Sequence, residues 1–254
     1  MNSDNRNEKI EAQEIKLDRG ESRVLSWLDN FWYHHKWKVI IIGFFAVFIV
    51  VGIVQMAGKT ESDIGVTVAT HTVYYKENVS ALERDLESLM PRDRNGDGKK
   101  YVSLNTFKIY SEMELEHANS AETDEEGNPV IYADEAYNKD QISQFNSFVG
   151  TGECTVMILS RYMYDDMVAR RAQDGLLVPM SEIYGESMPE GVTSDGYGIL
   201  LKSTGAYEYF DSFKTIPDDA VICIMRPFVF NASAAADKLP FAIDYFKSIV
   251  SFGR

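Results

Sequence analysis

The residues whose types and spacing come closest to a known chemistry lie in the segment 91–100, PRDRNGDGKK. Oxygen donors stand at alternate positions before a glycine, the order in which calcium loops place their first ligands. Such loops end with a bidentate acid at position twelve, where this chain has Leu104. The candidate metal ligands are the side chains of Asp93, Asn95 and Asp97 and the backbone carbonyl of Lys99.

Two interpretations of this segment stay open. If an acid or water from elsewhere completes the shell, the loop binds calcium and the ion holds a corner between a helix and a strand. If nothing completes it, Asn-Gly-Asp-Gly forms a tight turn, for which these residue types are also favoured. A structural calcium ion is the only cofactor that the sequence suggests.

A second group of candidates follows the apolar run 154–160, CTVMILS. A run without alternation is typical of a strand that is covered on both faces. Open α/β sheets bind ligands beyond the carboxyl ends of such strands, and a later DGYG segment adds one tyrosine. The predicted ligand contacts are Ser160, Arg161, Tyr162 and Tyr197. The alternative is that they are ordinary loop residues, with Tyr162 used in packing.

The sequence lacks the common motifs of catalytic sites. It has no G-x-S-x-G, no H-E-x-x-H and no glycine-rich phosphate loop. His71 and His117 have no partner at a telling spacing, so we expect each to be a lone surface or strand-end residue. Cys154 and Cys223 lie in apolar runs that suit either a disulfide or two buried thiols. We therefore expect a protein that is not an enzyme.

The charge distribution excludes one class of partner. The formal net charge is −14, and residues 1–58 carry equal numbers of acidic and basic side chains. The whole acidic excess therefore falls on residues 59–254. An acidic surface repels the phosphates of nucleic acid, so we expect no nucleic-acid partner.

Residues 39–58 give the strongest structural signal, because 20 consecutive residues carry no charge. As a helix they would be about 30 Å long, which matches the apolar core of a bilayer. A buried core helix is disfavoured because the segment is apolar all round, and a cleaved signal peptide because the 38 residues before it are too many. We predict a single transmembrane helix in the cell membrane, with the lipid bilayer as partner.

The flanks of this segment predict its orientation. Lys36 and Lys38 precede it, whereas Glu61 and Asp63 soon follow it. Because positive charge favours the cytoplasmic side, residues 1–38 should be a cytoplasmic tail and residues 63–254 an extracellular domain after a linker, 59–62. Apolar residues at helical spacing in the tail predict a juxtamembrane amphipathic helix on the inner leaflet. They are Val24, Leu25, Leu28, Phe31 and Trp32.

The extracellular domain alternates strand-like and helix-like segments, which predicts an α/β fold with one mainly parallel sheet sandwiched by helices. We expect the acidic stretch 112–128 to be a solvated excursion or a hairpin tip. The expected strands are 63–75, 101–110, 154–160, 195–203 and 220–230, and the expected helices 76–90, 134–152, 161–175 and 239–252.

Three segments resemble the extracellular solute-binding proteins of ABC importers, the periplasmic-binding-protein type II-like family. They are 150–185, the stretch DGYGILLKS and the ending NASAAADKLPFAIDYFKSIVSF. The resemblance implies one lobe of such a protein, because fewer than 200 residues are present, on a signal-anchor helix of Gram-positive bacterial type. It implies a membrane-anchored, non-catalytic binding or interaction module, with a small-molecule ligand or a membrane protein as partner. The alternative is a regulatory or scaffold subunit of a membrane transport or envelope complex.

Overall fold

The computed structural model describes residues 4–57, 61–72, 74–120, 134–152, 154–227 and 232–254. Their side chains are described in 25–28, 30–54, 61–72, 74–118, 134–152, 154–227 and 237–254. The chain divides into two compact units, Met1–Thr60 and Glu61–Arg254. Each unit is described by itself.

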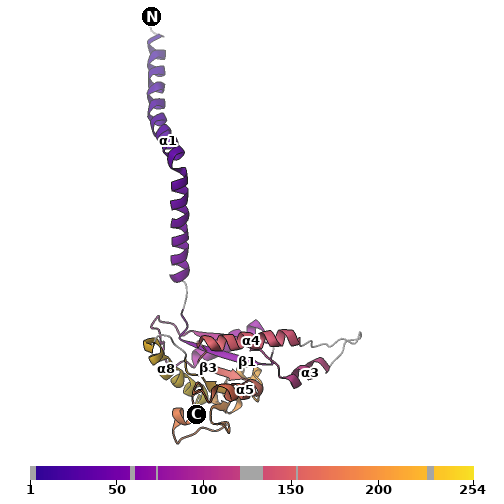
Figure 1. Cartoon of the computed structure of the whole chain (residues 1–254). Coiled ribbons are helices and arrows are strands. Elements are labelled where there is room, and N and C mark those ends of the chain that lie inside the picture. The colour runs from indigo at the N-terminus through magenta and orange to yellow at the C-terminus, as the bar shows by residue number, and fades with distance from the viewer. Residues whose placement is uncertain (1–3, 58–60, 73, 121–133, 153, 228–231) are drawn as a thin grey trace. The chain divides into compact units, whose positions relative to one another are not determined.

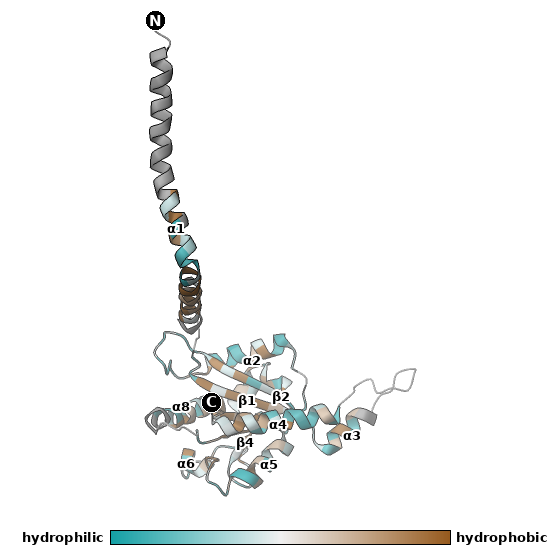
Figure 2. Ribbon diagram, turned by 45° about the horizontal axis from the view of Figure 1, so that its top comes forward, coloured by the Kyte–Doolittle hydropathy of each residue, from teal (hydrophilic) through white to brown (hydrophobic). Residues whose placement is uncertain are grey.

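The first unit is the helix α1, Asp4–Ala57 (Figure 1). Its part Asn30–Val54 is long and apolar enough to cross a membrane, and no share of it is buried inside the protein. Figure 2 shows a hydrophobic band in the lower turns of α1, directly after a more polar stretch. The prediction of one membrane-length apolar helix is confirmed, and such a helix fits an anchor or a signal sequence. The inner-leaflet position of the tail stays a prediction; the structure continues the same helix through it.

The second unit contains a five-stranded sheet in the order β2-β1-β3-β5-β4. Strand β1 pairs in parallel with both β2 and β3, whereas β5 is antiparallel to β3 and β4. The α/β class is confirmed, and the sheet is mixed because β5 runs against the other four strands. The strands are β1 Ile64–Thr70, β2 Val102–Lys108, β3 Val156–Leu159, β4 Gly198–Leu200 and β5 Val221–Ile224.

Helices cover both faces of the sheet (Figure 1). On one face Val66 and Val68 of β1 pack with α2 and α8; on the other, Met157 and Leu159 of β3 pack with α4 and α5. Alternation along the strands thus builds two cores. The helices are α2 Lys76–Ser88, α3 Glu112–Ser120, α4 Glu135–Thr151, α5 Arg161–Arg171, α6 Met180–Tyr184, α7 Gly205–Tyr209 and α8 Ala232–Val250, with short 3-10 turns η1 Leu201–Ser203 and η2 Phe213–Thr215.

One expectation about secondary structure is wrong. The acidic stretch from Glu112 begins as helix α3 rather than as an irregular excursion. Ser111 Oγ accepts a hydrogen bond from the N–H of Glu114 at 3.2 Å, and Glu114 Oε2 accepts one from the N–H of Ser111 at 2.7 Å. This reciprocal capping box satisfies backbone groups that would otherwise lack partners. The rest of the stretch, 121–128, lies outside the described residues.

Both cysteines are buried free thiols, which is the second of the two interpretations that the sequence left open. Burial raises the pKa of the Cys154 thiol to about 12, although a hydrogen bond with Thr67 acts in the opposite direction. Burial also raises the pKa of Cys223. Since the thiolate is the reactive form, neither thiol is activated as a nucleophile.

Gly205, the first residue of α7, lies against the backbone of Phe252, and a substitution at Gly205 tests this close contact. A Cβ added there would lie 1.8 Å from the backbone oxygen of Phe252, which cannot move without shifting the end of the chain. We expect Gly205→Ala to cost about 3 kcal/mol of stability. The matched control is Gly150→Ala in α4, where nothing lies within 4 Å and the helix should gain about 0.5–1 kcal/mol. Thermal unfolding followed by circular dichroism measures both, and equal melting temperatures would contradict the prediction.

Candidate functional site

Asp63, the residue before β1, organises the segment that the sequence singled out. Its side chain is 3 % exposed. Oδ1 accepts hydrogen bonds from the N–H groups of Arg94 at 2.7 Å and Asn95 at 3.0 Å, and Oδ2 accepts one from the N–H of Tyr101 at 3.0 Å. Three backbone donors thus compensate one buried carboxylate, which without them would be costly to bury. The sequence offered one weak sign of this role, an acid at the start of an apolar strand.

The predicted metal ligands are turned toward the loop's own backbone. Asp93 accepts hydrogen bonds from the N–H groups of Gly96 and Gly98, both at 2.7 Å. Asn95 accepts one from Asp97, and Asp97 accepts one from Lys99, both at 2.9 Å. These bonds account for the loop as a turn. Two carboxylates, an amide and a carbonyl are four groups, and they reach the six to eight oxygens that calcium takes only if both carboxylates bind through two oxygens or water completes the shell, so calcium binding stays a prediction.

Among the side chains that the structure describes, no group of three or more His, Cys, Asp or Glu residues is placed to hold a metal ion.

The loop is also fixed to its surroundings. Nε of Arg94 donates to the carbonyl oxygen of Asp63 at 2.6 Å, and Nδ2 of Asn95 donates to that of Glu61 at 2.8 Å. The Arg92 guanidinium lies 5.5 Å from the centre of the Phe241 ring in α8. The loop therefore connects the start of β1 with α8, and it forms one wall of a groove.

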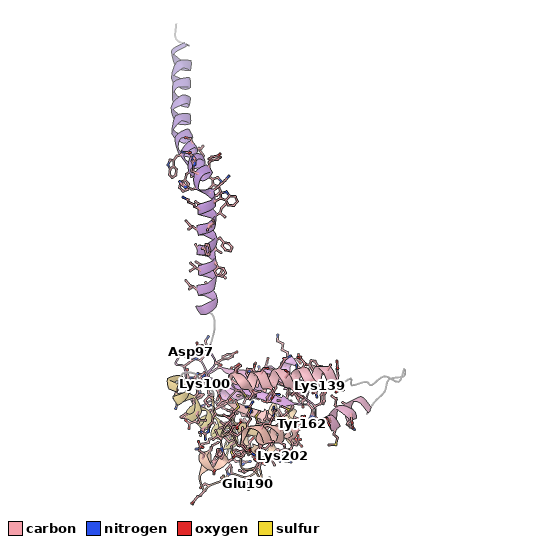
Figure 3. All side chains as sticks on the ribbon, viewed as in Figure 1. Asp97, Lys100, Lys139, Tyr162, Glu190 and Lys202 are labelled. Atoms are coloured by element: carbon pink, nitrogen blue, oxygen red, sulfur yellow. The ribbon has the colours of Figure 1, made fainter. Side chains whose placement is uncertain are left out.

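This groove has a volume of about 720 Å³ and lies where β1 and β2 begin. Phe148 of α4 lines one side of it and Phe241 of α8 another. Three polar side chains of the sheet line it as well: Ser103, Asn105 and Thr155. The groove is at the amino ends of the parallel strands, whereas the predicted ligand residues follow a carboxyl end. Figure 3 shows Asp97 of the loop and Tyr162 well apart in the domain.

The strand register brings the polar side chains of the groove together. Ser103 pairs with Gly65, and Asn105 pairs with Thr67. Thr155 comes one residue before Val156, the partner of Val66, so it lies beside Gly65 on the opposite side from Ser103. Within the described parts of the chain, no hydrogen bond joins the side chains of Ser103, Asn105 and Thr155 to another residue. Sequence reasoning missed all three, because their proximity depends on parallel pairing.

The four predicted ligand contacts take up other positions. Ser160 is buried and caps α5, where its Oγ accepts a hydrogen bond from the N–H of Met163 at 3.5 Å. Arg161 lies in the first turn of α5 rather than in a loop, and its Nε is 2.9 Å from Oδ1 of Asp165. Tyr162 is 42 % exposed. The structure brings these three together but places Tyr197 on another segment; the ligand-binding role of all four stays a prediction.

Tyr197 belongs to a polar network beside β4. Its N–H donates to Oδ1 of Asp195 at 2.9 Å, and that oxygen also accepts hydrogen bonds from the hydroxyls of Tyr164 and Thr193. Burial acts to raise the pKa of Asp195, but these hydrogen bonds outweigh it and lower the pKa. Burial and the bond to Asp195 raise the pKa of Tyr164. The network joins α5 to the turn before β4, so its role is structural.

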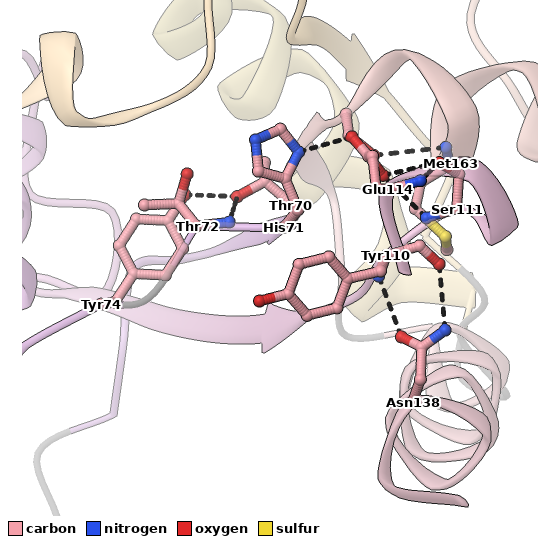
Figure 4. Close-up of polar contacts among 10 residues, drawn as sticks. Thr70, His71, Thr72, Tyr74, Tyr110, Ser111, Glu114, Asn138 and Met163 are labelled. Carbon is pink, nitrogen blue, oxygen red and sulfur yellow. Dashed lines mark hydrogen bonds and ion pairs between the residues drawn. The ribbon is translucent and has the colours of Figure 1, made fainter. Parts of the chain in front are cut away.

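His71 has partners that the sequence did not reveal. Its Nδ1 lies 2.7 Å from Oε1 of Glu114 in α3, and its ring stacks on Tyr110 at 6.4 Å (Figure 4). Asn138 of α4 accepts a hydrogen bond from the N–H of Tyr110 and donates one to its carbonyl oxygen. His71 thus lies at a strand end, as expected, but beside Glu114 and Tyr110 rather than alone. These contacts attach α3 and α4 to the carboxyl ends of β1 and β2.

Comparison with known proteins identifies no family. No family model, no curated protein and no solved structure matches the chain. The resemblance to solute-binding proteins thus rests on the three short segments named above.

The role of Asp63 can be tested by Asp63→Asn. The amide of asparagine has one acceptor oxygen where the carboxylate has two, and its NH2 group would face a backbone N–H group. We therefore expect the free energy of unfolding to fall by about 2–4 kcal/mol. The control is Asp97→Asn, since an exposed amide still accepts the single N–H bond from Lys99; we expect a change within about 0.5 kcal/mol. Urea unfolding of both variants gives the comparison, and similar losses would show that the Asp63 bonds do not organise the loop.

Proposed function

We propose that the chain is a membrane-anchored binding module whose domain, Glu61–Arg254, lies outside the cytoplasm and holds a ligand without changing it chemically. The observation that supports this best is the groove at the amino ends of β1 and β2, where three polar side chains lack partners among the described residues. Hydroxyl and amide groups that are open to a groove can exchange their water for the polar groups of a ligand. The non-catalytic part of the proposal rests on the sequence, which carries no catalytic motif.

The bilayer is the proposed partner of α1. The apolar side chains of Asn30–Val54 are exposed all round the helix, a state that water disfavours and lipid accepts. With Lys36 and Lys38 just before the uncharged residues 39–58, the N-terminus is proposed to be cytoplasmic. The long helical stretch before the segment favours a retained anchor over a cleaved signal sequence.

The similarity to one lobe of a solute-binding protein, of Gram-positive bacterial type, is part of the same proposal. It is supported by the α/β architecture and by the size of a unit with one sheet between two helical layers. It favours a small-molecule ligand.

A second candidate function is a regulatory or scaffold subunit of a membrane transport or envelope complex. It is favoured by the exposed aromatic side chains of α1 just before the span, where Trp27 stacks on Phe31 with ring centres 5.5 Å apart. Trp27 is 63 % exposed and Trp37 is 70 % exposed. Aromatic residues at this level either anchor in the lipid interface or contact another membrane protein.

The two functions predict different results for the full chain in lipid nanodiscs. For a binding module, at least one class of polar solute at about 100 times its Kd raises the stability of the domain by about 2.7 kcal/mol, visible as a higher melting temperature. For a complex subunit, no solute changes the melting temperature, and a photoreactive residue in place of Trp37 captures one membrane protein reproducibly in cells. The second pattern would replace the first function.

The calcium hypothesis is retained as a proposal with a structural role for Asp93, Asn95, Asp97 and Lys99. It predicts that millimolar calcium raises the melting temperature of the full chain and that Asp93→Ala removes the increase. Magnesium at the same concentration is the control, because it demands a stricter octahedral shell. An unchanged melting temperature would leave only the turn.

A further inference from the structure

The floor of the groove is formed by neutral hydrogen-bonding groups on one face of the sheet. Ser103 and Thr155 flank Gly65 in one row, and Asn105 stands two residues further along β2 on the same face. Adjacent strands lie about 4.8 Å apart, so the backbones at Ser103 and Thr155 are about 10 Å apart with no side chain between them. This gap has the width of a single six-membered ring with its substituents.

Thr155 shows most clearly that the floor is available to a ligand. The residue is 5 % exposed, and its hydroxyl has no hydrogen-bond partner in the part of the chain that the structure describes; Oγ1 is not among the atoms that are both buried and unpartnered, so it is open to the groove. A hydroxyl that is open to a groove bonds water in the free protein, and a ligand group can replace that water as its partner. A ligand hydroxyl in the gap beside Gly65 would be such a group.

The charges around the groove favour a neutral ligand. Glu61 and Asp237 are opposed by Arg94 and Lys238, so these four side chains cancel. The remaining charge is that of Asp63, whose carboxylate already accepts three backbone N–H bonds. Arg94 is itself engaged, since its guanidinium donates to backbone oxygens of the chain before β1. Among the described residues that line it, the groove thus has no excess of positive charge with which to select an anion.

The side of the groove offers an apolar surface to the same ligand. Phe148 of α4 lines it, is half-buried, and is held by its contact with Phe107, whose ring centre is 5.8 Å away. An aromatic face beside neutral polar groups suits a molecule with hydroxyls at its edge and C–H groups on its faces.

We propose that this groove binds a neutral, hydroxyl-rich ring, either a free monosaccharide or one sugar residue of a glycan. The proposal rests on the proposed function of a binding module and names the ligand class of the same groove. It places the ligand at the amino ends of the strands, opposite to the carboxyl-end residues Ser160, Arg161 and Tyr162.

Saturation-transfer NMR on the full chain in nanodiscs tests the proposal; alkyl maltoside detergents must be avoided because they carry sugar. The probes are glucose, galactose, mannose and N-acetylglucosamine, compared with glucose 6-phosphate and the dipeptide Ala-Ala. We expect transfer to at least one neutral sugar and weaker binding of the two charged probes. Maltotriose and chitotriose distinguish the two sources, since tighter binding of a trisaccharide than of its monosaccharide indicates a glycan.

Two threonines provide a matched pair of variants. We expect Thr155→Val to weaken sugar binding about tenfold, the effect of one lost hydrogen bond, and to leave the melting temperature unchanged or higher because no protein partner is lost. Thr193→Val removes a hydroxyl that bonds with Asp195 and Tyr164, so it should lower the melting temperature and leave the sugar affinity unchanged.

Three results would overturn the proposal: no transfer to any sugar, unchanged affinity in Thr155→Val, or equal or tighter binding of a charged probe. If Ala-Ala binds and Thr155→Val weakens it, the ligand class is wrong while the binding function stands. If no solute binds and none changes the melting temperature, the binding function fails as well.

Discussion

The carboxylate of Asp63 is the interaction on which the rest of the domain depends. Asp63 is the residue just before β1. Its carboxylate accepts hydrogen bonds from two parts of the chain: the N–H groups of Arg94 and Asn95 in the loop, and the N–H of Tyr101 just before β2. Parallel neighbours such as β1 and β2 cannot be joined by a tight hairpin, so their relative position needs a fixed point outside the strands. Asp63 provides this point one residue before the pair Ile64 and Val102.

The parts of the fold that could be predicted are those in which local pattern decides the outcome. The apolar run of α1, the alternation of strands and helices, and the helix ended by Gly152 follow from composition and spacing. The reversed direction of β5 could not be predicted, because it is set by pairing with β3 and β4 across more than twenty residues of chain. Helix α3 was missed although Ser111 and Glu114 stood at capping-box spacing, since the acidic composition suggested a solvated loop.

The candidate site illustrates a harder limit. Ser103 and Asn105 belong to β2 and Thr155 precedes β3; only the register of β2, β1 and β3 places them in one groove. The residues that did attract attention, Ser160 and Arg161, proved to cap and stabilise α5. Ser160 and Arg161 are thus paired within the protein, whereas the side chains of Ser103, Asn105 and Thr155 have no hydrogen bond to another described residue. This pairing pattern is visible only in three dimensions.

The position of Asp63 also has a mechanical consequence. Glu61, Ser62 and Asp63 are the first residues of the domain after the helical unit, and they lead directly into β1, which lies inside the sheet with a parallel neighbour on each side. Tension transmitted along the chain therefore enters the domain at a buried charge and loads the ladders of β1 with β2 and β3 in shear, many bonds at once, rather than opening an edge one bond at a time. The same residues line the groove, so a force on the chain before β1 would act on the wall of the groove as well.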